Sequence, residues 1–303
     1  KATGESTDKR ISLSNNNSKT RFSQILHILQ EIYHLLTIGS SCTLRELYYR
    51  DPELLETQIN VTASVQDICC LLEASPMELG VLSSSKGLIA GNIQITLVDD
   101  TVIDCSRYSG GVLIPQETSG IKKLETTAQL LLIVEKDTVF ERLLERNILT
   151  ILGYDLILIT GKGFPDINTR VMVKKILNLL KLPVYCLVDA DPFGIEILMV
   201  YRYGSRAMSY NSDLLACPKI HWIGVHPSEI ELLAIPCIPL GAQDKKRITD
   251  LLDRTYLSDH IRDELLILQR VGQKAEIESV ANFSLNYLTV DYIPNKIKLS
   301  FLV

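Results

Sequence analysis

The sequence lacks an apolar run long enough to cross a membrane, and it lacks the apolar N-terminal segment of a signal peptide. It also lacks an excess of positive charge, because the formal net charge of its 303 residues is −5. That balance excludes a protein that is basic all over, but a local basic face is enough to bind nucleic-acid phosphates. With 46% hydrophobic residues, the chain can bury a large core and is long enough for two domains.

Paired cysteine motifs and nucleotide-binding loops are missing too. None of the seven cysteines belongs to a C-x-x-C pair, which argues against a zinc site and against a disulfide framework. A reducing compartment, cytosol or nucleus, is the simpler interpretation. No G-x-x-x-x-G-K-[ST] or G-x-G-x-x-G run is present, so the chain shows no nucleotide pocket of its own.

The N-terminal third predicts a small helical domain. Residues 1–21 are rich in Ser, Asn, Lys and Thr, and we expect a disordered tail there. Helical patterns follow in "RFSQILHILQEIYHLL", "TLREL" and "TASVQDICCLLEAS", and short β-like segments surround "SSSKGLIAGN" and "IQITLVDDTVIDC". Three helices followed by small strands predict a winged helix-turn-helix over residues 22–110.

The pattern changes after a linker predicted at residues 111–124. "LLLIVEK", "YDLILIT" and "LPVYCLVDAD" are short continuous apolar runs, as in buried parallel strands, with helical stretches between them. Strands that alternate with helices predict an α/β domain with a parallel sheet over residues 125–303. The fold class is therefore α/β (α+β for the chain as a whole).

Acidic residues follow two of these strands directly. Glu135 ends "LLLIVE", and Asp189 and Asp191 follow "VYCLV". Ligands of open parallel sheets bind beyond the carboxyl ends of the strands, and grouped carboxylates there suit Mg²⁺. The alternative is that each acid is a solvated loop residue or a helix N-cap, an interpretation that fits Asp191 best because Pro192 follows it.

Two adjacent tyrosines stand in "RELYYRDPEL", residues 45–54. Arg45 lies one helical turn before Tyr49 and so shares its face, whereas Tyr48 points about 100° away. This geometry favours Tyr49 as a nucleophile toward a DNA phosphate and Tyr48 as its support. The alternative is that both tyrosines only pack against the core.

Six motifs in order resemble the topoisomerase VI A-subunit family: "RELYYRD", "SSSKGLIAGN", "LLIVEKDTVFERLLE", "TGKGFPDINTR", "LVDADPFGIEI" and "YRYGS". The resemblance extends from about residue 22 to "YIPNKI" and is greater to the eukaryotic branch that makes meiotic double-strand breaks. It implies a winged-helix domain joined to a Toprim domain. It also implies the roles of the site residues: Tyr49 as nucleophile with Arg45 beside it, Mg²⁺ on Glu135, Asp189 and Asp191, and DNA contacts from Lys86, Phe164 and Arg170.

The resemblance further implies a nuclear enzyme that acts on double-stranded DNA as a homodimer, with each active site shared between protomers. The implied partners are meiotic accessory proteins and a topoisomerase VI B-like subunit, and no membrane is involved. The implied reaction is Mg²⁺-dependent double-strand breakage through a 5′-phosphotyrosyl intermediate, which initiates meiotic recombination. Three alternatives stay open: a topoisomerase VI A-type protein that reseals DNA, an inactive DNA-binding scaffold, and a nuclease that uses metal-bound water.

Overall fold

A computed structural model describes residues 11–15, 18–204, 215–280, 284 and 286–300. The chain divides into two compact units: Lys1–Ser84 with Ser205–Asp213, and Ser85–Gly204 with Leu214–Val303. Most of the predicted disordered tail lies outside the described residues, and the first helix already begins at Lys19. In the part of the chain that the structure describes, no helix is long and apolar enough to span a membrane. All seven cysteines are free thiols.

The first unit is built from helices around a small apolar core that includes Ile28, Leu47 and Ile68. Its helices are α1 (Lys19–Thr37), α2 (Leu44–Arg50), α3 (Pro52–Leu55) and α4 (Gln58–Leu72). Two short strands, β1 (Cys42–Thr43) and β2 (Val81–Leu82), pair in parallel beside them. This arrangement is consistent with the predicted helix-turn-helix.

Local sequence signals set the start and the end of helix α2. The Thr43 hydroxyl accepts a hydrogen bond from the Glu46 amide at 3.1 Å, and the Glu46 carboxylate accepts one from the Thr43 amide at 2.6 Å. This reciprocal capping box satisfies two backbone donors at the helix start. Pro52 begins the next helix, and the residue before a proline disfavours helical geometry, so α2 ends at Arg50.

The second unit contains a six-stranded sheet in the order β11-β10-β8-β9-β3-β6. The four strands on one side are parallel, and they include all three strands that the sequence predicts. The α/β fold with a parallel sheet is thus confirmed. The strand bounds are β3 (Leu88–Gly91), β6 (Val112–Leu113), β8 (Leu130–Val134), β9 (Leu156–Thr160), β10 (Val184–Leu187) and β11 (His221–Gly224).

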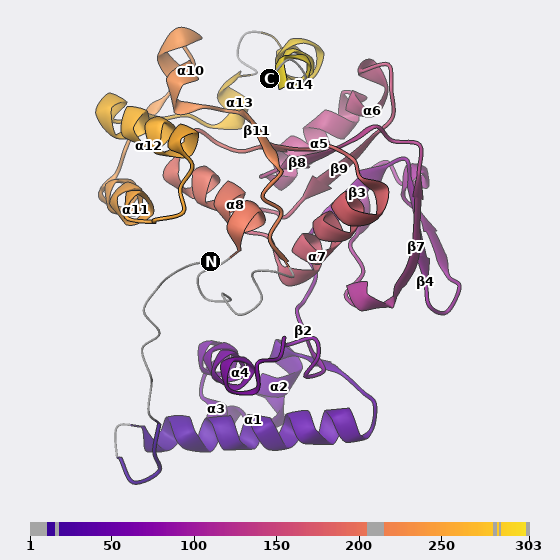
Figure 1. Ribbon diagram of the computed structural model, residues 1–303, viewed down its shortest axis with the longest axis vertical. Coiled ribbons are helices and arrows are strands. Elements are labelled where there is room, and N and C mark those ends of the chain that lie inside the picture. Colours follow the sequence, from indigo (N-terminus) through magenta and orange to yellow (C-terminus); the bar gives the residue numbers. More distant parts are fainter. Residues whose placement is uncertain (1–10, 16–17, 205–214, 281–283, 285, 301–303) are drawn as a thin grey trace. The chain divides into compact units, whose positions relative to one another are not determined.

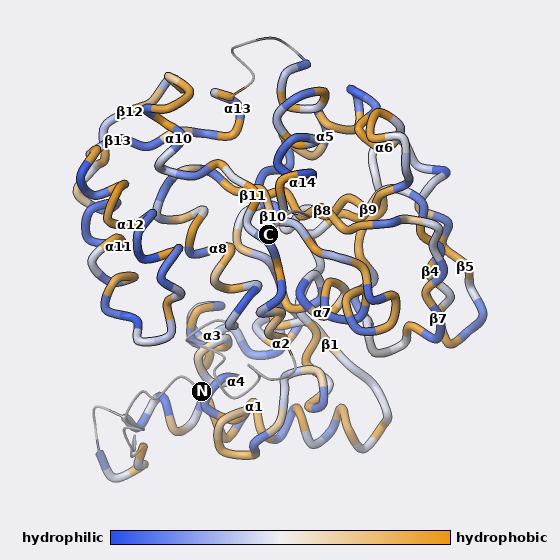
Figure 2. The backbone as a smooth tube through the Cα atoms, turned by 45° about the horizontal axis from the view of Figure 1, so that its top comes forward, coloured by the Kyte–Doolittle hydropathy of each residue, from blue (hydrophilic) through white to orange (hydrophobic). Residues whose placement is uncertain are grey.

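Helices cover both faces of this sheet (Figure 1). Alternate strand residues serve opposite faces: Leu131 and Ile133 pack with α7 and α8, whereas Leu132 and Val134 pack with α5. Figure 2 shows the central strands as largely hydrophobic stretches, as expected for a sheet buried on both faces. The helices are α5 (Asp137–Glu145), α6 (Ile148–Ile151), α7 (Ile167–Lys175) continued by a π-helix (Ile176–Leu180), and α8 (Pro192–Tyr203).

The C-terminal part of the second unit is mostly helical. Its helices are α10 (Pro227–Leu232), α11 (Ala242–Leu252), α12 (Asp259–Val271), α13 (Ile277–Val280) and α14 (Ile293–Ser300), with a π-helix (Leu288–Tyr292) before α14. Strands β12 (Ile238–Pro239) and β13 (Gln273–Lys274) form a small antiparallel pair.

The segment that the sequence assigns to the wing belongs to the second compact unit. Strand β3 pairs antiparallel with β9, and β4 (Ile93–Leu97), β5 (Val102–Asp104) and β7 (Ile121–Thr126) form a separate sheet in the order β5-β4-β7. Short 3₁₀ turns lie at Cys105–Arg107 and Thr118–Gly120. The division into compact units therefore falls at residues 84/85, whereas the sequence predicts a linker at residues 111–124 between domains at 22–110 and 125–303. The difference arises because a short apolar strand does not specify its partner.

Candidate active site

The two tyrosines of helix α2 have different environments. Tyr48 is half-buried and packs against the core of the first unit, while Tyr49 is 59% exposed. The Arg45 guanidinium lies 5.8 Å from the centre of the Tyr49 ring, and the two tyrosine ring centres are 5.3 Å apart. The structure thus brings Arg45 and Tyr49 together on an open face of α2. Core packing explains the position of the Tyr48 side chain, but it does not explain why the Tyr49 side chain is exposed.

In the second unit, Glu135 and Asp189 lie beyond the carboxyl ends of the adjacent parallel strands β8 and β10. Both are nearly buried, with 9% and 5% exposure. The Asp189 amide donates a hydrogen bond of 2.9 Å to Glu135 Oε2, so the side chain of one acid is tied to the backbone of the other. The structure therefore brings these two predicted residues together.

Asp191 is at the start of helix α8, where its Oδ1 accepts a hydrogen bond of 2.6 Å from the Gly194 amide. It is thus an N-cap, as the alternative interpretation of the sequence expects, but it also belongs to the acidic group. Burial raises the pKa of Glu135, and the nearby negative charges of Asp189 and Asp191 raise it further. Burial likewise raises the pKa of Asp189 and of Asp191. A group of buried, mutually repelling carboxylates is stabilised by a cation.

Sequence reasoning missed the residues that surround Asp189 from the other side. Lys136 Nζ lies 2.9 Å from Asp189 Oδ2, 3.0 Å from Glu278 Oε2 and 3.4 Å from Glu276 Oε2. Burial lowers the pKa of Lys136, but its hydrogen bonds and ion pairs with Asp189 and Glu278 outweigh burial and raise it overall. The "EKD" run places Lys136 directly after Glu135, but nothing in the sequence indicates a contact with residues about 140 positions away.

The donor chemistry of the acidic group fits a hard divalent cation such as Mg²⁺, which prefers carboxylate oxygens. Residue 194 adds to the fit, because a Cβ there would lie 3.0 Å from Glu135 Oε2 and 2.5 Å from the Asp189 carbonyl oxygen. Only glycine leaves this space around the acids open. However, among the described residues no three His, Cys, Asp or Glu side chains are arranged as a set that could hold a metal ion.

Two of the three residues that the sequence assigns to DNA contacts lie in neighbouring loops. Lys86 is exposed, and its ammonium donates to the Lys162 carbonyl oxygen at 3.1 Å. Phe164 is 41% exposed in the loop after β9. The Gly163 amide of that loop donates to the Glu135 carbonyl oxygen at 2.8 Å. Lys86 and Phe164 therefore share the end of the sheet that carries the acids.

Arg170 has a different environment. It is only 2% exposed, and no hydrogen-bond partner is found for its Nε and Nη2 atoms among the described residues. Burial lowers the pKa of its guanidinium to about 10. The guanidinium of Arg170 is therefore covered by protein in this structure, and its predicted contact with DNA stays a prediction.

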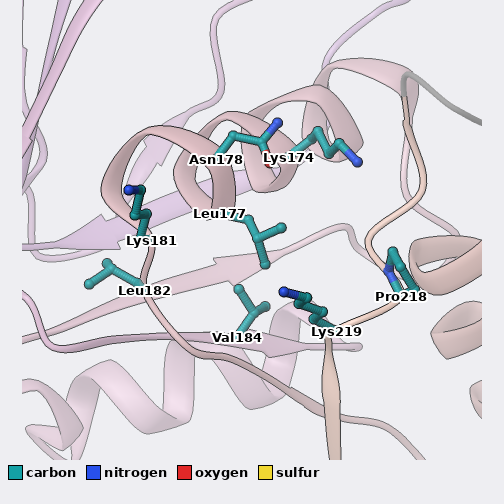
Figure 3. Close-up of a pocket in the computed structure, with 8 residues that line it drawn as sticks. All are labelled: Lys174, Leu177, Asn178, Lys181, Leu182, Val184, Pro218 and Lys219. Carbon is teal, nitrogen blue, oxygen red and sulfur yellow. The ribbon is translucent and has the colours of Figure 1, made fainter.

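A pocket of about 550 Å³ lies at the start of strand β10, at the opposite end of that strand from the acidic group (Figure 3). It combines three lysines with apolar side chains, and its lining consists of Lys174, Leu177, Asn178, Lys181, Leu182, Val184, Pro218 and Lys219. Val184 begins β10, whereas Asp189 follows the end of that strand. The pocket is therefore separate from the acidic group.

Comparison with known proteins shows which class of protein combines these features. Residues 130–297 match the family model for the Toprim domain of Spo11 and of the topoisomerase 6 A protein, and residues 20–81 match the family described as type IIB DNA topoisomerase. The chain belongs to this topoisomerase 6 A/Spo11 family, and it is a DNA-cleaving transesterase of the topoisomerase type.

Individual relatives match most of the chain. Meiotic recombination protein W68 of Drosophila melanogaster is 45% identical over 95% of this chain and 86% of its own length. Meiotic recombination protein SPO11 of Homo sapiens is 41% identical over 96% of this chain and 75% of its own length. The A-type subunit of DNA topoisomerase 6 from Arabidopsis thaliana is 35% identical over 89% of this chain and 64% of its own length. The resemblance seen in the sequence is thus confirmed.

Proposed function

We propose that the protein makes double-strand breaks in DNA through a phosphotyrosyl link at Tyr49 and so initiates meiotic recombination. The observation that carries this proposal is the exposed Tyr49 with the Arg45 guanidinium 5.8 Å from its ring, in a chain of this family. The identity with meiotic recombination proteins supports the meiotic role. A nuclear location follows from that role.

In the proposed reaction, Tyr49 Oη forms a bond to phosphorus and loses its proton, while the bond from phosphorus to the 3′ oxygen breaks. The 3′ oxygen gains a proton, and the 5′ end stays on the protein. Arg45 is placed to donate hydrogen bonds to the phosphate oxygens and to stabilise the negative charge that develops on them. Because one phosphoester bond replaces another, the step is reversible in principle.

Glu135, Asp189 and Asp191 are the residues that would hold Mg²⁺. When bound, the ion supplies positive charge to the transferring phosphate and its leaving oxygen. Lys86 is proposed to contact the DNA backbone, because its ammonium is exposed beside the loop that carries Phe164. Phe164 offers an apolar ring to DNA at the same end of the sheet. The DNA contact implied for Arg170 would require its guanidinium, which is 2% exposed, to become accessible.

Double-stranded DNA is the proposed substrate, and a homodimer is the proposed active form. Tyr49 and the acids belong to different compact units, so a nucleophile from one protomer can serve the acids of the other. A B-like protein is a further proposed partner, because one relative is named as a subunit of DNA topoisomerase 6. Meiotic accessory proteins complete the proposed assembly.

A resealing topoisomerase VI enzyme of the A type is the second candidate, and the 35% identity with such a protein favours it. Both candidates use the same residues. Strand passage in the presence of an ATPase B protein distinguishes them, because only the resealing enzyme relaxes supercoiled DNA.

Covalent capture tests the proposed chemistry. The protein is incubated with end-labelled duplex DNA, Mg²⁺ and a B-like subunit with its accessory proteins, then denatured and separated by electrophoresis. We expect label to migrate with the protein, to be lost in Tyr49→Phe and to persist in Tyr48→Phe. Label retained in Tyr49→Phe but lost in Tyr48→Phe would move the nucleophile to Tyr48. Free 5′ phosphates without captured protein would indicate a nuclease, and intact DNA would indicate an inactive scaffold.

A further inference from the structure

The strongest unexplained feature of the second unit is the half-buried Lys136 ammonium beside the acidic group. Lys136 Nζ is within 3.4 Å of three carboxylates, those of Asp189, Glu276 and Glu278. We propose that Lys136 is an internal counter-ion that competes with a divalent cation for Asp189, and that Glu276 and Glu278 receive it when the cation binds. This inference rests on the proposed metal-dependent function and adds a regulating residue to its site.

Both oxygens of Asp189 already have partners. Oδ1 accepts a hydrogen bond of 2.9 Å from the Ile277 amide, and Oδ2 forms the 2.9 Å ion pair with Lys136. A cation that coordinates Oδ2 would be within a few ångströms of the ammonium, where two positive charges repel strongly in a nearly buried site. Metal binding through Asp189 therefore requires Lys136 to move away from Oδ2.

The structure provides a place for the displaced ammonium. Glu278 is fixed by a hydrogen bond of 3.1 Å from the Thr138 hydroxyl to its Oε1, and its Oε2 already contacts Lys136. Glu276 is 59% exposed, so it can follow the ammonium outward. Rotation of a lysine side chain toward these two carboxylates keeps its charge paired throughout, and the backbone does not need to move.

The same contacts explain how the buried acids are tolerated when no metal is bound. Unpaired carboxylates in a buried site are costly, and one ammonium offsets part of that cost. The consequence is a metal requirement that depends on Lys136. The ion pair sets the concentration of divalent cation at which the site fills, because the cation must replace an existing positive charge.

Metal affinity, measured without DNA, tests the proposal independently of cleavage. Mn²⁺ is titrated into the full chain by calorimetry, and Lys136→Met removes the ammonium while keeping a flexible apolar side chain. In this variant the cation no longer has to displace the charged hydrogen bond between Lys136 and Asp189. We therefore expect about tenfold tighter Mn²⁺ binding. Lys162→Met is the matched control, because Lys162 pairs with Asp137 at 2.8 Å and its loss changes the net charge equally. We expect less than about a twofold change in that control.

A second variant tests the receiving carboxylates. Glu278→Gln removes one alternative partner of Lys136, so we expect Mn²⁺ binding to weaken several-fold. When Lys136 is already replaced by Met, Glu278→Gln should not change the Mn²⁺ affinity, because Glu278 no longer has an ammonium to pair with. If Lys136→Met does not fold, the counter-ion role is tested by Glu278→Gln alone. We expect this variant to bind Mn²⁺ more weakly than the Lys162→Met control does.

The outcomes separate this inference from the proposed function. Unchanged or weaker Mn²⁺ binding in Lys136→Met, together with binding that is lost in Asp189→Asn, would overturn the counter-ion role and keep the metal site. No Mn²⁺ binding by the unmodified chain, or binding that persists in Asp189→Asn, would overturn the metal site and the counter-ion role together. Tighter binding in Lys136→Met with loss in Asp189→Asn supports both.

Discussion

The buried carboxylate of Glu229 gives a sharp prediction about stability and pH. Glu229 is 7% exposed on helix α10 and pairs with the Lys296 ammonium. Its Oε2 also accepts hydrogen bonds from the Tyr292 hydroxyl at 2.7 Å and from the His226 amide at 2.8 Å. Burial alone would raise the pKa of Glu229, but the hydrogen bonds from His226, Lys296 and Tyr292 outweigh it and lower the pKa to about 2.

The sign follows from linkage. A carboxyl whose pKa is lower in the folded state stabilises the fold above its unfolded pKa of 4.5, and the contribution is lost as the pH falls toward 2. The difference of 2.5 pKa units corresponds to about 3 kcal/mol at pH 7 and to about half of that at pH 3. We therefore expect Glu229→Gln to lower the free energy of unfolding by about 3 kcal/mol at pH 7 and by clearly less at pH 3.

The single tryptophan makes this measurement local. Trp222 lies on β11 with its ring centre 4.4 Å from that of His226, so its fluorescence reports unfolding around Glu229. Denaturant titrations of the unmodified protein and Glu229→Gln at pH 7 and pH 3 give the two differences. A loss that is equal at both pH values would refute the reasoning, since it would mean that the charge of Glu229 does not contribute.

Two further changes test the fold of each compact unit. Thr43→Ala removes the N-terminal cap of α2 and should lower the free energy of unfolding of the first unit by about 1 kcal/mol, measured by thermal denaturation. Thr43→Ser keeps a hydroxyl and should retain most of that free energy. Equal stability of all three proteins would contradict the role of the cap. Gly91→Ala would place a Cβ 2.2 Å from the Leu156 carbonyl oxygen at a φ of 103°. It should lower the free energy of unfolding of the second unit by about 2–4 kcal/mol, followed by tryptophan fluorescence, and an unperturbed variant would show that β3 does not approach β9 this closely.

Local patterns in the sequence predict much of this fold. The apolar runs of β8, β9 and β10 are recognisable because a strand that is covered on both faces has no polar alternation. The capping box of α2 is equally local, as Thr43 and Glu46 are three residues apart. The grouping of Glu135 and Asp189 follows from a general rule about parallel strands, so sequence alone can place them at one edge.

Features that depend on distant contacts could not be predicted. The partner of β3 is β9, about seventy residues later, and a four-residue apolar strand has no preference that identifies it. The contacts of Lys136 with Glu276 and Glu278 join segments about 140 residues apart. The burial of Arg170 is a similar case, because the "TGKGFPDINTR" motif does not show that packing covers this side chain.

The antiparallel pairing of β3 with β9 has a practical consequence for producing the second unit, which contains the Toprim domain, alone. A fragment that begins at residue 125, at the domain boundary suggested by sequence, would leave the "LILIT" strand as an open edge with a row of unpaired backbone groups and no charged side chain. Such an edge pairs readily with other chains, so we expect that fragment to aggregate. A fragment that begins at Ser85 is longer, keeps β3 paired with β9, and is therefore expected not to aggregate.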